Sequence, residues 1–172
     1  MSKSIVGIAT TTGQVEKLIT RLKSREGIAE SEISVLIPDT DGTHDFGHVK
    51  VSKAPEGATT GAVSGGVLGG IVGLLAGIGA LAIPGVGPLI AAGPIMAALS
   101  GVAAGAAAGG LVGGLIGLGI PELEAKIYDE KLKKGNFLIA AHPADGKESD
   151  RIVKAFKEEG LEDVCTTSEK SS

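Results

Sequence analysis

The sequence predicts an α+β fold: a ferredoxin-like βαβ-βαβ domain that is split by a long glycine-rich helical hairpin. On both sides of the insert, short β-branched runs alternate with amphipathic segments, which is the pattern of two βαβ halves. The 65 residues between Glu56 and Glu122 carry no charge, although both flanks are highly charged. Within that stretch, glycine recurs at every fourth position in two separate runs.

The charge distribution divides the chain into three regions. Residues 1–56, the first half of the ferredoxin-like domain, hold seven Lys or Arg and eight Asp or Glu. Residues 57–121 are the uncharged hairpin. Residues 122–172, a linking helix and the second half of the domain, hold nine Lys or Arg and twelve Asp or Glu. Neither half is basic or aromatic enough for a nucleic-acid surface, so we expect no nucleic-acid partner.

The first half reads as strand, helix, strand. Residues 4–9 form a short β-branched strand that ends in a polar run of three threonines and a glycine. A helix follows and stops at Gly27, and its apolar face has the spacing i, i+3, i+4, i+7. That face consists of Val15, Leu18, Ile19 and Leu22. A second strand over residues 33–37 is closed by Pro38.

The second half repeats this order after the linking helix. The linking helix spans residues 122–134, a strand spans 137–141, a helix stops at Gly160, and the last strand spans 161–166. The linking helix is expected to bury Leu123, Ile127 and Leu132, and the later helix Ile152, Val153 and Phe156. Asp145 or Ser149 can cap the later helix. Cys165 lies in the alternation of the last strand, which favours a buried structural thiol.

The insert contains two glycine ladders with a spacing of four. Residues four apart lie above one another on a helix, so each ladder leaves one helix face nearly free of side chains. Such faces allow close helix packing, and a period of four favours a helix over a strand. The ladders consist of Gly57, Gly61, Gly65, Gly69, Gly73 and Gly77, and of Gly101, Gly105, Gly109, Gly113 and Gly117.

Between the ladders, residues 83–88 predict a chain reversal. Two prolines and two glycines end one helix and permit a tight turn, namely Pro84, Gly85, Gly87 and Pro88. The first arm, residues 57–83, would be ~40 Å long and the second, residues 89–120, ~48 Å, with a kink or restart at Pro94. Either arm exceeds the ~30 Å hydrocarbon core of a bilayer. A hairpin keeps both termini on one side, and nearby lysines favour the cytoplasmic side.

A buried hairpin inside a protein oligomer would have the same composition. The insert contains no Trp, Tyr or Phe, so it lacks the aromatic residues that are common at membrane interfaces. The sequence therefore leaves two placements open: a hairpin inserted in or coating the cytoplasmic membrane, and a cytoplasmic assembly in which hairpins are buried between subunits. Both make the chain its own partner, and the first adds membrane lipid.

No pattern indicates catalysis. His44 and His48 lie four apart, but turn-forming residues surround them, so solvated loop histidines are favoured over a metal pair. Residues 145–149 resemble a phosphate loop but lack its leading glycine, because position 141 is alanine. We therefore expect no catalytic, cofactor-binding or metal-binding residues, and no enzyme.

Several segments together carry a family resemblance. They are residues 53–58, 80–88 and 119–122, followed by Tyr128 and the pair Lys134–Gly135. In this combination the chain resembles the bacterial general stress protein family that has a heat-induced stress-protein domain. The resemblance implies split ferredoxin-like flanks and a cytoplasmic setting, and it brings no catalytic residues. The loop from His44 to His48 has no counterpart in that pattern.

The expected function does not involve catalysis. The leading hypothesis is a non-enzymatic, stress-associated protein that forms homo-oligomers through a glycine-zipper hairpin inserted in or coating the cytoplasmic membrane. One alternative is a soluble scaffold that assembles into rings, filaments or shells. Another is a ligand-sensing regulatory module built on the ferredoxin-like domain.

Overall fold

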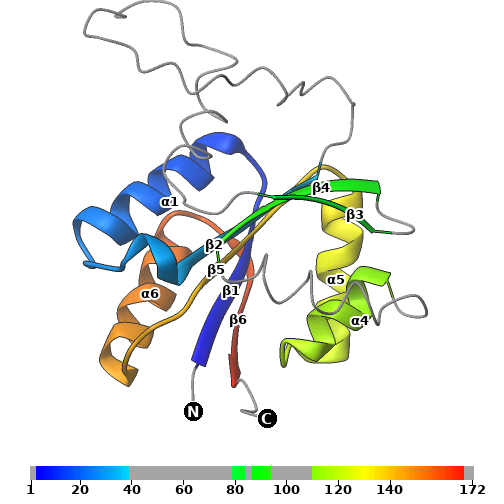
Figure 1. Ribbon diagram of the computed structural model, residues 1–172. Helices are drawn as coiled ribbons and strands as arrows, with labels where there is room; N and C mark the ends of the chain where they lie inside the picture. Colours follow the sequence, from blue (N-terminus) through cyan, green and yellow to red (C-terminus); the bar gives the residue numbers. More distant parts are fainter. Residues whose placement is uncertain (1–2, 39–78, 84–86, 94–109, 169–172) are drawn as a thin grey trace, which may run out of the picture.

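The computed structural model describes residues 3–38, 79–83, 87–93 and 110–168 (Figure 1). The strands are β1 (Lys3–Ala9), β2 (Ile33–Pro38), β3 (Gly79–Ile83), β4 (Gly87–Ala92), β5 (Phe137–Ala141) and β6 (Glu162–Ser168). The helices are α1 (Thr12–Ser24), the 3-10 turn η1 (Glu30–Glu32), α4 (Gly110–Gly117), α5 (Glu122–Lys133) and α6 (Gly146–Glu158).

The strands form one sheet in the order β3-β4-β2-β5-β1-β6, and each neighbouring pair is antiparallel. Helices α1 and α6 cover one face of the sheet, and α4 and α5 cover the other (Figure 1). The α+β class is therefore confirmed. The predicted strands and helices of both flanks are present, with ends that differ from the expected ones by a few residues.

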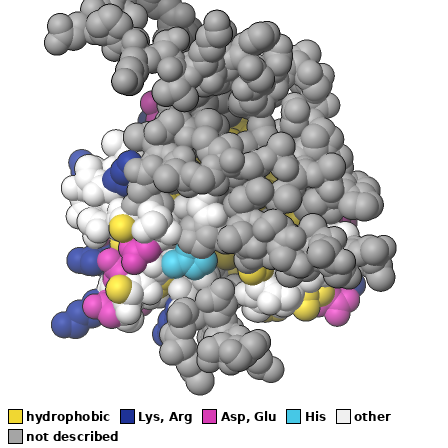
Figure 2. All heavy atoms as spheres, in the orientation of Figure 1, with side chains coloured by type: hydrophobic (Ala, Val, Ile, Leu, Met, Phe, Trp, Pro, Cys, Tyr) yellow, Lys and Arg dark blue, Asp and Glu magenta, His cyan; other side chains and the backbone are white. Residues whose placement is uncertain are grey.

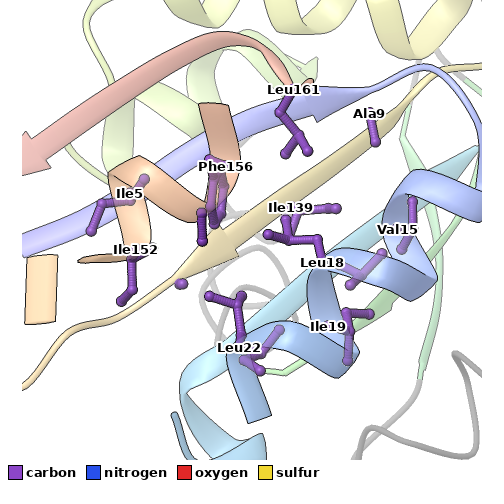
Figure 3. Packing of buried hydrophobic residues seen from close by; sticks show 14 of the residues in the cluster. Ile5, Ala9, Val15, Leu18, Ile19, Leu22, Ile139, Ile152, Phe156 and Leu161 are labelled. Atoms are coloured by element: carbon purple, nitrogen blue, oxygen red, sulfur yellow. The ribbon is translucent and has the colours of Figure 1, made fainter. Parts of the chain in front are cut away.

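The face under α1 and α6 holds the larger core. The predicted inward face of α1, with Val15, Leu18, Ile19 and Leu22, is fully buried. From α6, Ile152 and Phe156 are buried, and Val153 packs at the edge of the same cluster. Figure 3 shows Phe156 among side chains from the sheet and from α6. Both helices begin at side-chain caps, Thr11 for α1 and the predicted Asp145 for α6.

The face under α4 and α5 differs from the prediction at one position. Leu123 is 69% exposed, whereas α5 buries Ala125, Tyr128 and Leu132. The reason is that Tyr128 fills more apolar volume than Leu123 while its hydroxyl still finds an acceptor, the Asp163 carbonyl at 2.7 Å. Burying Tyr128 turns Leu123, five residues earlier on the helix, outward. Ile127 is half-buried.

The helical prediction is wrong for residues 79–83 and 89–92, which lie in strands β3 and β4. A short apolar run fits a buried strand as well as a helix, and glycine weakens the helical choice. Tertiary context decides, because β2 would otherwise be an open sheet edge although all six of its residues are buried. Strand β4 covers that edge, with Val35 opposite Ala92 and Leu36 opposite Ala91. The chain reverses within the predicted range 83–88, because β3 ends at Ile83 and the antiparallel β4 begins at Gly87, but Gly87 and Pro88 belong to β4.

Gly93 allows β4 to dock against β2. Its φ is +84°, in the left-handed region that favours glycine. A Cβ at this position would overlap the Ile33 carbonyl oxygen and lie 2.9 Å from Ser34 Cα. The backbones of β2 and of the residue that follows β4 therefore approach each other at a distance that only glycine permits.

Candidate self-association surface

Helix α4 is the described part of the second glycine ladder, and it has two unlike faces. Leu111, Gly114 and Leu115 are buried, and the two leucines join a cluster that contains Tyr128 of α5. Gly113, Ile116 and Gly117 lie at i, i+3 and i+4 on the other side, which we call the outer face of α4. Ile116 is 42% exposed, and a Cβ added at Gly113 would meet nothing within 4 Å.

The end of α4 is fixed by a glycine turn. Gly119 has φ +84°, its N–H donates to the Ile116 carbonyl at 2.9 Å, and the Ile120 N–H donates to the Leu115 carbonyl at 3.1 Å. These two bonds make the Schellman helix end, which satisfies carbonyls that would otherwise lack partners. Ile120 is buried at 3% exposure, so the turn also anchors the chain between α4 and α5. The orientation of the outer face is therefore set by packing on the other side.

Along the chain, α4 and the turn that follows it carry no charged residue, and charge begins at Glu122 of α5. Among the described residues, Ile116 and Leu123 are the two large hydrophobic side chains that are exposed. Figure 2 shows hydrophobic side chains next to a few charged ones on the side of the molecule that carries α4, and a larger number of charged side chains on the opposite side. Lys126 bonds Glu122 at 2.6 Å across one turn of α5, and this bond lowers the pKa of the Glu122 carboxyl.

The structure places only part of the predicted packing residues. Gly113 and Gly117 lie on the outer face of α4, and a Cβ at Gly113 would meet nothing within 4 Å. Of the predicted turn, Gly87 and Pro88 open β4, opposite Ile83 and Ala82 of β3. The remaining predicted positions lie outside the described residues: Gly57, Gly61, Gly65, Gly69, Gly73, Gly77, Gly101, Gly105, Gly109, Pro84 and Gly85. Close helix packing along the ladders therefore stays a prediction.

A polar cluster near Tyr128 joins α5 to β6. The register of β6 against β1 shifts between Val6 and Ile8, and Asp163, with φ +48°, lies in the corresponding bulge. Lys131 pairs with the carboxylates of Glu162 and Asp163, which raises the pKa of its ammonium group. Burial, followed by the nearby Glu124, raises the pKa of the half-buried Cys165 thiol. A thiol with a raised pKa is a poor nucleophile at neutral pH.

Replacing Tyr128 with phenylalanine is expected to destabilise the fold by about 1 kcal/mol at pH 7, because the bond to Asp163 is lost. Burial raises the pKa of Tyr128 above its ordinary value of 10.0, so the folded state resists ionisation. The stability that the neutral hydroxyl contributes is present below pH 10 and declines as pH rises toward the folded-state pKa. Urea unfolding of both proteins from pH 8 to pH 11 should show the difference shrinking, and a constant difference would contradict this account.

One polar contact was not anticipated from the sequence. The His142 Nδ1 lies 2.9 Å from the Ser4 hydroxyl, and its Nε2 lies 3.5 Å from that of Ser34, so the imidazole joins β1 and β2 at the end of β5. Both serines are buried. In the sequence, the only sign of this contact is that Ser4 and Ser34 are hydroxyl residues within otherwise apolar strands. The described ranges hold no group of three His, Cys, Asp or Glu placed for a metal. His44 and His48 lie outside those ranges.

The charged contacts on the other face join α1 to α6. The Arg21 guanidinium pairs with Glu158 and, at 3.1 Å, with Glu159. The amide nitrogen of Gln14 donates to the carbonyls of Glu159 and Gly160 at 3.3 and 3.2 Å. Arg21 lowers the pKa of the Glu158 carboxyl. Because these groups bond one another, the cluster stabilises helix packing and does not indicate a ligand site.

Within the described ranges, no helix combines the length and the apolar character needed to cross a bilayer. Comparison of the chain with models of protein families, with curated proteins and with solved structures finds no match.

Proposed function

We propose that this chain is a non-enzymatic protein that self-associates through its glycine ladders at the cytoplasmic membrane. The outer face of α4 carries the proposal. Its two ladder glycines and Ile116 face away from the packed side of the helix, in a segment without charge. A partner helix can approach such a face closely and gain packing contacts along its length.

The same proposal includes a ferredoxin-like domain as the carrier of the ladders. Two units, β1-α1-β2 and β5-α6-β6, occupy the sheet in the order β2-β5-β1-β6 with both helices on one face, which supports that assignment. Strands β3 and β4, helices α4 and α5 and both ladders come between the two units in the chain. On this view the domain holds the ladders in place and has no chemistry of its own.

Membrane lipid and a role in stress belong to the proposal as well. An uncharged run of 65 residues flanked by charged ones favours an apolar environment, and the resemblance to general stress proteins suggests production under stress. The two alternatives differ in what they require. A soluble ring, filament or shell needs no lipid, and a ligand-sensing domain needs a small molecule that stabilises it.

Substituting Gly113 and Gly117 with leucine is expected to weaken self-association at least tenfold. The added side chains would hold a partner helix away from the stripe, whereas glycine-to-leucine changes favour the helix itself. Analytical ultracentrifugation with and without detergent would measure the oligomeric state, and flotation with lipid vesicles would measure membrane binding.

The matched control is leucine at Gly13 and at Gly146. A Cβ at either position also meets nothing within 4 Å, and both lie in the first turns of helices on the opposite face of the sheet. These variants should associate as the unmodified chain does. Unchanged association of the Gly113 and Gly117 variant would remove the ladder from the proposal. Large lipid-free particles without vesicle binding would favour the soluble scaffold.

A further inference from the structure

The solvent side of α5 carries charges of alternating sign. Four residues at intervals of four form one line along the helix, which we call the charge line. They are Glu122, Lys126, Glu130 and Lys134, and all four are exposed. Lys134 follows the last helical residue and still continues the line, because its N–H donates to the Glu130 carbonyl at 3.2 Å. The line therefore runs along the surface for the whole length of α5.

Apolar side chains accompany the charge line. Leu123 is the most exposed large hydrophobic side chain of the described residues, and the half-buried Ile127 lies one turn further along the helix. Tyr128 and Leu132, on the other side of α5, are buried in the cluster that includes side chains of the sheet. Covering Leu123 would remove apolar surface from water, which favours a partner at this position.

The order of the charges selects a second copy of the same helix in the antiparallel orientation. Along α5 the signs are minus, plus, minus, plus, and the reversed helix presents them as plus, minus, plus, minus. Two antiparallel copies that share a midpoint at Tyr128 place Glu122 opposite Lys134 of the partner. Lys126 then lies opposite Glu130 of the partner, and a twofold axis produces each pair twice. Parallel helices in register would place equal charges opposite each other, which is unfavourable.

We infer that two copies of this chain associate through antiparallel α5 helices, with their charge lines paired and Leu123 covered by the partner. The inference rests on the proposed self-association and deepens it by naming a second contact and the orientation of the partner. Glu122 and Lys126 bond each other within one chain, but their side chains stay 67% and 60% exposed and can bond the partner as well.

The two kinds of contact have different roles. Exposed ion pairs add little affinity, but they fix the orientation of the partner and disfavour the parallel arrangement. Two helices of this length also cover less surface than a stable interface usually buries. The contact between α5 helices therefore acts together with the glycine ladders, and each strengthens the other because both join the same two copies.

Charge exchange tests the pairing. Lys126→Glu with Lys134→Glu gives a line of four carboxylates, and Glu122→Lys with Glu130→Lys gives a line of four ammonium groups. Each full-length variant alone should associate about tenfold more weakly than the unmodified chain in analytical ultracentrifugation. A one-to-one mixture should regain the affinity, because opposite charges then meet at every position. Unchanged association, or a loss that mixing does not restore, would overturn the inference.

Lys147→Glu with Lys154→Glu is the matched control for the carboxylate variant. It changes the net charge by the same amount, at two exposed positions of α6 on the other face of the sheet. This control should associate as the unmodified chain does. An equal loss in the control would mean that net charge alone weakens association, and it would overturn the inference.

Disulfide formation tests the orientation in full-length protein whose Cys165 is replaced by serine. Ile127→Cys lies beside the twofold axis, so mild oxidation should link two copies through it. Lys134→Cys should not link to itself, because the two positions are about 18 Å apart along antiparallel helices. It should link to Glu122→Cys when the two variants are mixed. Self-linking at position 134, or no link at position 127, would overturn the antiparallel arrangement.

The leucine variant of Gly113 and Gly117 separates this inference from the proposed function. If that variant weakens association and the charge variants do not, the contact between α5 helices is wrong and the glycine ladders remain. If the charge variants weaken association, recover on mixing, and the leucine variant has no effect, the ladders are wrong and the contact between α5 helices remains.

Discussion

Substituting Gly93 with alanine is expected to lower the free energy of unfolding by about 3 kcal/mol. Two costs combine. The residue has φ +84°, which costs an L-amino acid about 1 to 2 kcal/mol, and the new Cβ would overlap the carbonyl of Ile33. Ile33 belongs to β2, which is an inner strand of the sheet. The overlap would therefore be relieved by movement of β4 away from β2. Urea unfolding would measure the loss, and hydrogen exchange of the β2 amides would show where the structure opens.

Gly27 provides the matched control for this prediction. It also has a left-handed φ of +70°, but a Cβ there would meet nothing within 4 Å. Gly27→Ala should therefore show the conformational cost alone, about 1 kcal/mol, with unchanged exchange in β2. Equal losses for the two variants would mean that the contact between Gly93 and Ile33 does not hold β4 in place.

The flanks were predictable because local pattern and tertiary burial agree there. In α1, the spacing of Val15, Leu18, Ile19 and Leu22 identifies the inward face from the sequence alone, and all four are buried. In α5 the local pattern and the tertiary burial disagree. The pattern favoured Leu123, but the position of the sheet and the acceptor at Asp163 select Tyr128. An acceptor supplied by a bulge 35 residues later leaves no trace in the local sequence.

The insert was the least predictable region for a related reason. The period of four is a helical signal, and it holds for α4, where Gly113 and Gly117 occupy one face. It says nothing about the residues between the ladders. Residues 79–83 and 87–92 are strands because β2 offers a partner edge, and that edge exists only once the sheet has formed. The contact of His142 with Ser4 and Ser34 likewise arises from strand order, which joins residues more than 100 positions apart.

Substituting Phe156 with alanine is expected to destabilise the fold by about 4 kcal/mol, the largest single effect that we predict for a core side chain. The ring is fully buried between α6 and the sheet (Figure 3). It lies close to Gly7 of β1. A Cβ at Gly7 would lie 3.0 Å from Phe156 Cδ1 and 3.3 Å from Leu161 Cδ2, closer than comfortable packing. Gly7→Ala alone should therefore cost about 1 kcal/mol through crowding.

The two changes should compensate each other in part. Once the ring is removed, the methyl group at position 7 fills some of the cavity and has only Leu161 Cδ2 as a close neighbour, so the double variant should be more stable than the sum of the single losses predicts. We expect a coupling of about 1 kcal/mol in a double-mutant cycle measured by urea unfolding. Gly13→Ala, at a position with open surroundings, should combine additively with Phe156→Ala. Additive losses for Gly7 and Phe156 would mean that the ring does not rest on Gly7, and that α6 is not seated on β1 through this contact.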